Sequence, residues 1–234
     1  MAERTAGSIR ARVRAELVDE IKNVARRQLA EGGANLSLRA IARELGMVSS
    51  ALYRYFASRD ELLTALILDA YNSLGEAVET AGEAIRERAD HLGRWLTVAH
   101  AIRNWAVARP HEYALIYGSP VPGYAAPQDT VEPSIRPVIV LGAILEDAHA
   151  AGRLAPANLL PPEPILRPEL AQIREVVAPH VSEAVMARGL IAWTELFGAV
   201  NFELFGRFQN TITDLEAWFD HQARAMGAYL GLAG

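Results

Sequence analysis

The side chains best suited to recognition chemistry lie on a short predicted helix in the N-terminal quarter of the chain. Residues 49 to 56 read SSALYRYF, so two serines, an alanine and two tyrosines accompany the apolar Leu52 and Phe56. Hydroxyl groups donate to phosphate oxygens, and small side chains let a helix approach base edges in the major groove. The pattern therefore favours contact with duplex DNA.

Residues suited to enzymatic chemistry are sparse. The chain has no cysteine, which excludes disulfides, thiolate catalysis and thiolate zinc sites. Glu146 to His149 forms an E-x-x-H, but a di-iron site in a helix bundle needs two such motifs and further carboxylates, and no second E-x-x-H occurs. Phosphate-binding glycine loops and nucleophile elbows are also missing. We therefore predict no enzyme activity, no metal site and no cofactor.

Two short helices joined by a glycine turn position the polar set. Ser37 is a good N-cap for the first helix, and its apolar residues recur at helical spacing: Leu38, Ile41, Ala42 and Leu45. Gly46 permits a turn at positive φ, and the second helix is predicted over residues 49–56. Ser58 to Glu61 is an S-x-x-E capping box that opens a third helix. This order is the plan of a DNA-reading helix-turn-helix.

The segment resembles the N-terminal domain of TetR/AcrR-type transcriptional repressors. The residues that match the family pattern are Ala42, Gly46, Leu52, Tyr53, Tyr55, Phe56, Arg59 and Leu62. One position departs from it, because Val48 stands where the family usually has a Ser or Thr that caps the recognition helix. If the cap passes to Ser49, the helix starts one residue later and the set of base-contacting residues changes.

The resemblance implies roles for seven residues at the DNA. Tyr53 would donate its hydroxyl to a phosphate, Arg59 would pair with a second phosphate, and Ser37 would present its hydroxyl and free amides to a third. The residues that would face the major groove are Ser49, Ser50, Ala51 and Tyr55. A basic arm, made of Arg4, Arg10, Arg12 and Arg14, would reach flanking phosphates. A half-buried core position is the alternative for Tyr53.

The charge distribution agrees with a DNA-facing N-terminus. Residues 1–60 carry eleven Lys and Arg against seven Asp and Glu, a net +4. The remainder carries 12 basic against 21 acidic residues, a net −9, which gives the whole chain its −5. A solvated charged face would explain the +4 alone, but beside the motif it supports a domain that faces phosphate.

The whole chain has the pattern of an all-α protein with two domains. We predict a helix-turn-helix domain over residues 1–60, containing three helices, and a larger ligand-binding and dimerisation domain over residues 61–234. The predicted helices beyond the helix-turn-helix cover residues 58–88, 93–108, 111–117, 131–153, 181–208 and 214–232, with proline-rich connections at 118–133 and 155–168. No apolar run approaches the length of about 20 residues that crosses a bilayer. A cytoplasmic protein without membrane contact is expected.

The last helices resemble the C-terminal domain of one TetR subgroup. Trp193, Gly198, Glu203 and Gly206 match its pattern, and Phe197 occupies the position of the usual His. The resemblance implies a homodimer through the last two helices and an apolar effector cavity in the larger domain. The candidate seam residues of the dimer are Ala184, Leu190, Ile191, Ala199, Phe202, Phe219, Met226 and Leu230, and the small Gly189, Gly198 and Gly206 would let the helices approach closely. The candidate lining residues are Trp95, His100, Arg103, Trp105, Tyr117, Tyr124 and Trp193. Core packing is the alternative for the aromatic members, whereas Arg103 would orient an acceptor or anionic group of the effector.

The sequence thus predicts a homodimeric transcriptional repressor. A small apolar or aromatic effector would release it from an inverted-repeat operator in duplex DNA. The alternative is a helical ligand carrier or enzyme that retains a helix-turn-helix fold.

Overall fold

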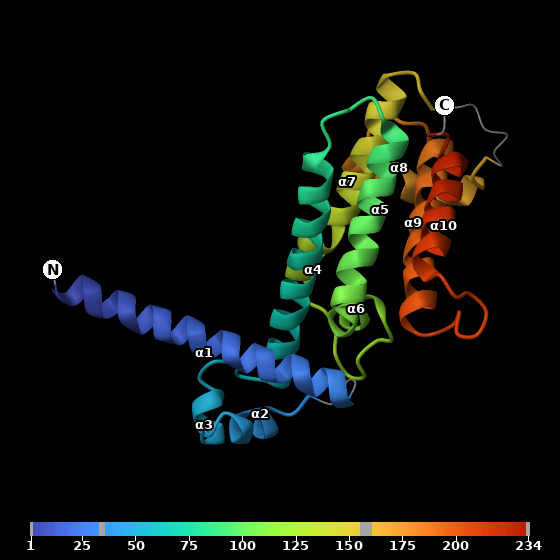
Figure 1. Cartoon of the computed structure of the whole chain (residues 1–234). Coiled ribbons are helices and arrows are strands. Elements are labelled where there is room, and N and C mark those ends of the chain that lie inside the picture. Colours follow the sequence, from blue (N-terminus) through green and yellow to red (C-terminus); the bar gives the residue numbers. More distant parts are fainter. Residues whose placement is uncertain (1, 33–35, 155–160, 233–234) are drawn as a thin grey trace. The chain divides into compact units, whose positions relative to one another are not determined.

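The computed structural model describes residues 2–32, 36–154 and 161–232 of the chain. Within them every regular element is helical, which confirms the predicted all-α fold (Figure 1). The helices are α1 (Ala2–Gly32), α2 (Leu38–Glu44), α3 (Ser49–Leu52), α4 (Arg59–Ala84), α5 (His91–Ala108), α6 (Pro110–Tyr117), α7 (Val131–Ala150), α8 (Arg167–Val177), α9 (Glu183–Leu204) and α10 (Leu215–Leu230), with 3-10 turns η1 (Gln128–Thr130) and η2 (Pro164–Leu166). Across the described ranges, no helix combines the length and apolarity needed to cross a membrane.

The chain divides into two compact units. The first unit contains Met1–Tyr71 and His111–Thr130, and the second unit contains Asn72–Pro110 and Val131–Gly234. Helix α4 therefore begins in the first unit and ends in the second. The boundary at residue 60 between the predicted DNA-binding domain and the predicted ligand-binding and dimerisation domain stays a prediction.

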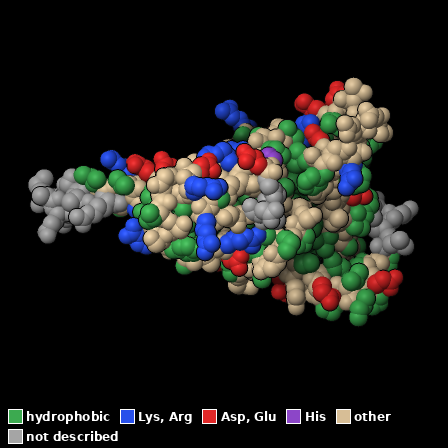
Figure 2. Space-filling model, turned by 90° about the horizontal axis from the view of Figure 1, so that it is seen from below, with side chains coloured by type: hydrophobic (Ala, Val, Ile, Leu, Met, Phe, Trp, Pro, Cys, Tyr) green, Lys and Arg blue, Asp and Glu red, His purple; other side chains and the backbone are tan. Residues whose placement is uncertain are grey.

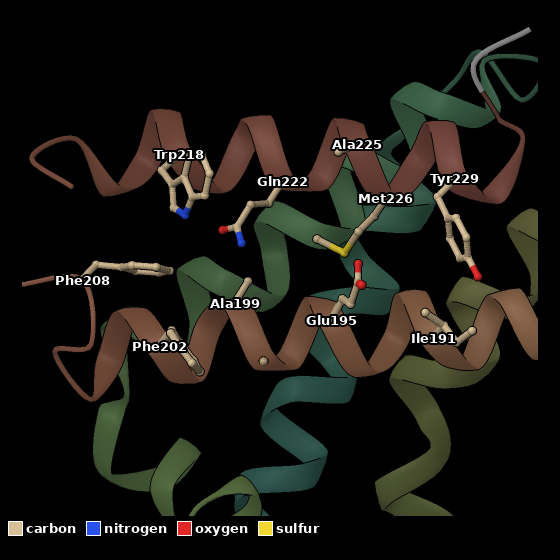
Figure 3. Close-up of a pocket in the computed structure, with 11 residues that line it drawn as sticks. Ile191, Glu195, Ala199, Phe202, Phe208, Trp218, Gln222, Ala225, Met226 and Tyr229 are labelled. Atoms are coloured by element: carbon tan, nitrogen blue, oxygen red, sulfur yellow. The ribbon is translucent and has the colours of Figure 1, made fainter. Parts of the chain in front are cut away.

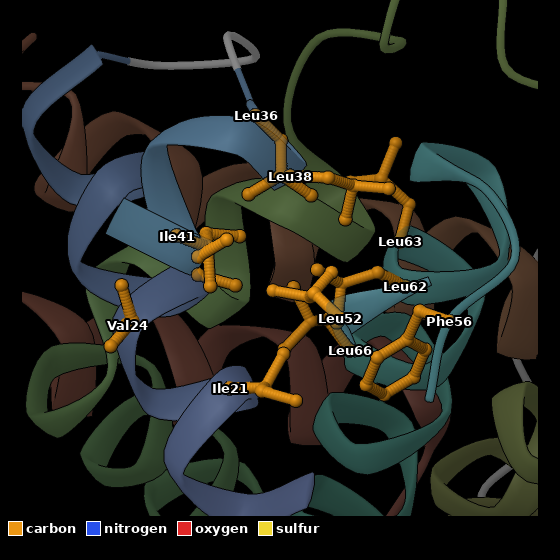
Figure 4. Packing of buried hydrophobic residues seen from close by; sticks show 12 residues of the cluster. Ile21, Val24, Leu36, Leu38, Ile41, Leu52, Phe56, Leu62, Leu63 and Leu66 are labelled. Atoms are coloured by element: carbon orange, nitrogen blue, oxygen red, sulfur yellow. The ribbon is translucent and has the colours of Figure 1, made fainter. Parts of the chain in front are cut away.

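The core of the first unit joins α1, α2, α3 and the start of α4. Large apolar side chains from all four segments meet there, and those with 0% exposure include Ile21, Ile41, Leu52, Leu62 and Leu63 (Figure 4). Burying one such side chain contributes about 1.5–3 kcal/mol. This core therefore fixes α3, which is too short to be stable by itself.

Helix α5 is central to the second unit and packs against α7, α9 and α10. Its buried face carries Trp95, Val98, Ile102 and Trp105 at helical spacing. The indole Nε1 of Trp95 donates to the carbonyl oxygen of Ala223 on α10 at 2.8 Å. The aromatic stripe of α5 is thus part of the core of this unit.

Several predicted helix bounds differ from the structure, and α9 ends at Leu204 instead of residue 208. The recognition helix ends at Leu52 instead of residue 56, and α4 ends at Ala84 instead of 88. Helix α8 lies partly where the proline-rich pattern predicts a loop through Pro168. Pro168 instead lies in the first turn of α8, where a helix needs no N–H donor. Residues 155–160 of the predicted loop lie outside the described residues.

Candidate functional site

The N-terminus of α2 is capped as the sequence predicted. The Oγ of Ser37 accepts a hydrogen bond from the backbone N–H of Ala40 at 3.3 Å. The backbone N–H of Ser37 donates to Oε1 of Gln28 on α1 at 3.3 Å, which ties the cap to the preceding helix. Ser37 itself is exposed. The phosphate contact assigned to it stays a prediction.

The turn between α2 and α3 depends on a glycine in the left-handed region. Gly46 has φ +66°, a conformation that strains residues with a Cβ atom. The N–H of Met47 then donates to the carbonyl oxygen of Ala42 at 2.8 Å and closes the end of α2. Gly46 therefore sets the direction in which α3 leaves the turn.

Helix α3 begins without a side-chain cap. Val48 occupies the N-cap position with extended backbone, and no side chain accepts from the first amides. The cap does not pass to Ser49, which is the first residue of the helix. Ser49 and Ser50 are exposed and Ala51 is half-buried. Two hydroxyl groups and the uncapped amides at this end are therefore open to solvent.

The two tyrosines that follow α3 differ in their surroundings. Tyr53 is 45% exposed, so its hydroxyl can reach a partner outside the protein. Tyr55 is half-buried and packs against the core of the first unit. The guanidinium carbon of Arg14, on α1, lies 4.8 Å from the centre of the Tyr55 ring. The contact with the major groove of DNA that was assigned to Tyr55 stays a prediction, but the guanidinium of Arg14 already covers one face of the Tyr55 ring.

The predicted capping box is present at the start of α4. The Oγ of Ser58 accepts from the N–H of Glu61 at 3.0 Å. The carboxylate of Glu61 accepts from the N–H of Ala57 at 2.6 Å, so the box closes one residue earlier than the usual pattern. Arg59 is the first residue of α4, and its Nη1 lies 3.5 Å from Oδ1 of Asp60. The capping box thus fixes the backbone at the first turn of α4, where Arg59 lies.

The charged groups of the first unit fall into two sets. Lys22 and Arg26 form ion pairs with Asp69, at 2.9 and 2.7 Å, and Arg26 Nε also lies 3.4 Å from Oε1 of Glu112. Arg39, Arg43 and Arg54 are exposed, and none forms an ion pair within the part of the chain that the structure describes. Figure 2 shows Lys and Arg side chains on the face seen from below, with Asp and Glu side chains between them. Such free cations suit a phosphate-facing surface.

Two of the seven predicted effector residues share a cavity in the second unit. Trp95 and Trp193 line an apolar cavity of about 30 Å³ among α5, α7, α8, α9 and α10. Its other walls are Val138, Leu141, Gly142, Leu145, Ile173, Val177, Met186, Gly189, Leu190 and Leu230. The indole Nε1 of Trp193 is buried and has no acceptor among the described residues. The cavity thus combines apolar walls with one free donor on a lining residue.

The other predicted effector residues of the second unit have protein partners. Arg103 donates to both carboxylate oxygens of Glu203, at 2.8 and 2.7 Å, and both side chains are about nine-tenths buried. His100 Nε2 lies 3.1 Å from Oδ1 of Asp220. Trp105 Nε1 donates to the Oγ of Ser73 at 3.0 Å. Arg103 and Trp105 therefore serve the core of the unit, and none of these three side chains lines the cavity.

Tyr117 and Tyr124 belong to the first unit. Tyr117 contacts Tyr71 and Tyr113 ring to ring, with centroid distances of 6.2 and 5.3 Å. Burial raises the pKa of the Tyr117 phenol. The hydroxyl of Tyr124 is 2.9 Å from that of Thr64. These tyrosines form a cluster of their own, which the sequence pattern did not reveal.

The outer face of α9 and α10 carries an open apolar groove of about 710 Å³ (Figure 3). Its lining residues are Ile191, Glu195, Gly198, Ala199, Phe202, Phe208, Trp218, Gln222, Ala225, Met226 and Tyr229. Phe202 and Ile191 are 53% and 47% exposed. A contiguous exposed apolar patch of this kind is typical of an interaction surface.

The groove corresponds only in part to the seam that the sequence suggested. The candidate seam residues that line it are Ile191, Gly198, Ala199, Phe202 and Met226. Phe219 and Leu230 instead point into the core, each with 1% exposure. The sequence reasoning missed Trp218, Gln222, Ala225 and Tyr229, although their spacing of three and four residues marks one face of a helix.

Comparisons with known proteins agree with this geometry. Residues 21–66 match the family model described as "Bacterial regulatory proteins, tetR family". Residues 95–226 match the model described as "Tetracyclin repressor-like, C-terminal domain". The chain is 40% identical over 230 residues, 93% of each protein, to the HTH-type transcriptional regulators Rv1816 of Mycobacterium tuberculosis and Mb1846 of Mycobacterium bovis.

Solved structures show the same architecture. A crystal structure of a protein described as regulatory, SCO4313, superposes with a TM-score of 0.75 at 34% identity, and the match covers 92% of this chain and 97% of that one. A protein of unknown function from Rhodococcus sp. RHA1 superposes with a TM-score of 0.66 at 23% identity, over 92% and 93% of the two chains. The second likeness concerns the fold alone.

Proposed function

The chain belongs to the TetR family of bacterial transcriptional regulators, and we propose from this that it is a homodimeric repressor released from its operator by a small apolar effector. The observation that carries the proposal is the uncovered polar face of α3. Ser49, Ser50 and Tyr53 are exposed there, while Leu52 is buried beneath them. Because Leu52 anchors the helix in the core, its hydrogen-bonding groups point away from the protein and are held in fixed positions.

The proposed DNA contacts divide into two kinds. Tyr53, Arg59 and Ser37 would hold phosphates and set the register of the protein on the duplex. Ser49, Ser50 and Ala51 would approach base edges in the major groove, where small side chains permit close contact. Arg39, Arg43 and Arg54 would add the charge that makes binding salt-dependent. The DNA of a bacterium lies in the cytoplasm, so the proposal includes a cytoplasmic location.

The groove on α9 and α10 would receive the same face of a second copy. A two-fold interface uses one surface on both partners, so the groove needs a surface that is self-complementary. Its aromatic end, with Phe202 and Trp218, supplies protruding side chains. Gly198 supplies an open position, where an added Cβ would meet no atom within 4 Å. Two copies would then present two recognition helices to the two halves of an inverted repeat.

The effector would enter the cavity between Trp95 and Trp193. At about 30 Å³ the cavity holds no more than a water-sized group, so an effector must separate its walls. The walls are tight where α8 meets α7, because a Cβ on Gly142 would collide with the side chain and carbonyl oxygen of Val177. A ligand that binds only the widened state shifts the protein toward that state. The effector would thereby bias a two-state switch.

The chemistry of the cavity selects a neutral effector with a hydrogen-bond acceptor. No charged residue lines it, and the donors of Arg103 are engaged by Glu203. The free Nε1–H of Trp193 is the group that would meet the acceptor. A buried carboxylate without a cation would cost several kcal/mol, on the order given for unpaired ions. A ketone, ester or alcohol with an apolar body fits these walls better than an acid.

The test uses a labelled duplex selected by this protein from random-sequence DNA. Release of the duplex is followed by fluorescence anisotropy with two probes of similar shape, 2-acetylnaphthalene and 2-naphthoate. The neutral ketone should release the duplex at lower concentration than the carboxylate and should quench tryptophan emission. Release by neither probe, with no change in emission at saturating concentration, would count against the cavity as an effector site. Release by 2-naphthoate alone would overturn the neutral class.

A further inference from the structure

Arg14 contacts two parts of the segment that follows the recognition helix. Its guanidinium carbon lies 4.8 Å from the centre of the Tyr55 ring. Its Nη2 donates a long hydrogen bond of 3.4 Å to the carbonyl oxygen of Arg54. Arg14 and Arg54 are 40 residues apart in the sequence and belong to the same compact unit. The N-terminal part of α1 thus contacts the turn that follows α3.

Both contacts have a physical reason. Arg54 lies two residues beyond the end of α3, and its carbonyl oxygen accepts a charge-assisted hydrogen bond from the guanidinium. The Tyr55 ring packs against the core of the first unit, so it forms a platform for a guanidinium. Helix α3 has only four residues and no side-chain cap. A contact with the turn that follows it therefore bears on the position of the whole recognition helix.

The guanidinium of Arg14 keeps most of its donors. A guanidinium carries five N–H groups, and one of them is used by the carbonyl of Arg54. Arg14 is exposed and has no carboxylate partner among the described residues. Arg12, two residues earlier on α1, is different because its Nε lies 3.6 Å from Oε1 of Glu16. Arg14 is therefore a cation that is fixed in place and not neutralised.

Resting on the proposed DNA-binding function, we propose that Arg14 contacts a DNA phosphate beside the site that α3 reads, and that Tyr55 is its positioning residue. Tyr55 then acts through its ring and not through its hydroxyl, and it reads no base. The N-terminal part of α1 lies along the backbone of the DNA at the flank of each half-site. The phosphate contact adds affinity without sequence preference.

The test measures the binding of full-length variants to the selected duplex between 50 and 200 mM salt. Each phosphate contact contributes about 0.9 to the slope of log affinity against log salt. Arg14→Ala should reduce the slope by about 0.9 per protomer, weaken binding roughly tenfold per dimer, and leave the preferred sequence unchanged. Arg14→Lys should retain the slope. Arg12→Ala is the matched control and should change the slope less than Arg14→Ala does.

Tyr55 is tested by a pair of substitutions that separate its ring from its hydroxyl. Tyr55→Phe keeps the ring and should bind like the wild type, whereas Tyr55→Leu should weaken binding to the extent that Arg14→Ala does. The double variant Arg14→Ala/Tyr55→Leu should be no weaker than either single variant, because both remove the same contact. Thermal unfolding of each variant shows whether it folds, and the Arg14 variants decide the matter if Tyr55→Leu does not.

The outcomes separate this inference from the proposed function. A wild-type protein that selects no duplex would remove the proposed function itself. A wild-type protein that binds, with an unchanged slope in Arg14→Ala, would overturn the phosphate contact. A changed base preference in Arg14→Ala would mean that Arg14 contacts bases in the minor groove. A changed base preference in Tyr55→Phe would mean that the hydroxyl of Tyr55 contacts a base.

Discussion

Arg103 of α5 and Glu203 of α9 form a two-point ion pair, with Nε to Oε2 at 2.8 Å and Nη2 to Oε1 at 2.7 Å. The guanidinium also lies 5.6 Å from the centre of the Phe219 ring on α10. One side chain thereby joins three helices of the second unit. A pair of this kind fixes the register of the helices, because a shift that separated the partners would leave two buried charges unpaired.

Removal of one partner should be costly. Arg103→Ala leaves the Glu203 carboxylate buried without a cation, so the free energy of unfolding should fall by about 3–5 kcal/mol. The double variant Arg103→Leu/Glu203→Leu should recover much of this loss, because it buries no unpaired charge. Denaturant unfolding at one fixed protein concentration measures both. If Arg103→Ala lost less than about 1 kcal/mol and lost only its effector response, Arg103 would belong to the effector site after all.

The contact between Arg136 and Glu79 should make stability depend on pH. Arg136 donates to both oxygens of Glu79, at 2.8 and 2.6 Å, and these hydrogen bonds lower the pKa of that carboxyl group. A lowered pKa in the folded state means that the stabilisation is present above the ordinary pKa of 4.5 and is lost as the pH falls through the folded value. Glu79→Gln should therefore be less stable than the wild type at pH 7 and equal to it under acidic conditions. The difference at pH 7 should be at most about 1 kcal/mol, because the pair is partly exposed.

Two further variants test the same contact. Glu83→Gln, one turn later on α4, should not change the pH dependence, because Glu83 forms no ion pair within the described segments. In Gly75→Ala the new Cβ would lie 2.6 Å from Arg136 Nε, so the guanidinium must move. Gly75→Ala should thus reproduce the pH profile of Glu79→Gln. A profile like that of the wild type would mean that Arg136 keeps Glu79 in another arrangement.

The missing cap of α3 predicts a stabilising substitution. Val48 is 70% exposed, so its replacement loses little buried surface. A serine at this position can accept from the free amides of α3 and should raise the free energy of unfolding by about 1 kcal/mol relative to Val48→Ala. Thermal unfolding of the two variants measures the difference, and operator affinity should rise with it. Equal melting temperatures for Val48→Ser and Val48→Ala would show that no cap forms.

The features predicted correctly from the sequence are those with local signals. The Ser37 cap, the turn at Gly46 and the box from Ser58 to Glu61 each involve residues within four positions of one another, so the types and spacing of the residues are enough. Gly46 also belongs to the residues that carried the resemblance to the family. The three signals account for the order of α2, α3 and α4.

The features that escaped prediction depend on contacts between distant segments. Tyr55 contacts Arg14, 41 residues earlier, and Arg103 is neutralised by Glu203, 100 residues later. Periodicity showed that Phe219 lies on an apolar face but not whether that face meets α5 or the outer groove. No property of a single segment determines such pairings, because they follow from how the helices pack.

The groove on α9 and α10 predicts that a bulky residue at its open position disturbs assembly. Gly198→Trp should weaken self-association by about 5- to 150-fold, because overpacking costs about 1–3 kcal/mol. Ala150→Trp, at an exposed position at the end of α7, is the control and should leave association unchanged. Sedimentation equilibrium at micromolar concentration measures both. A wild-type protein that is monomeric under these conditions would contradict the proposed interface.

The central claim is sequence-specific binding of duplex DNA by two copies of α3. Selection from random-sequence duplexes with the purified protein, followed by sequencing of the retained DNA, tests it most directly. We predict enrichment of one inverted repeat whose half-sites are separated by about one helical turn, or a multiple of it. Ser50→Ala should change the enriched half-site, whereas Tyr53→Phe should weaken retention without changing it. Retention of DNA without any enriched sequence, or no retention at all, would contradict the account.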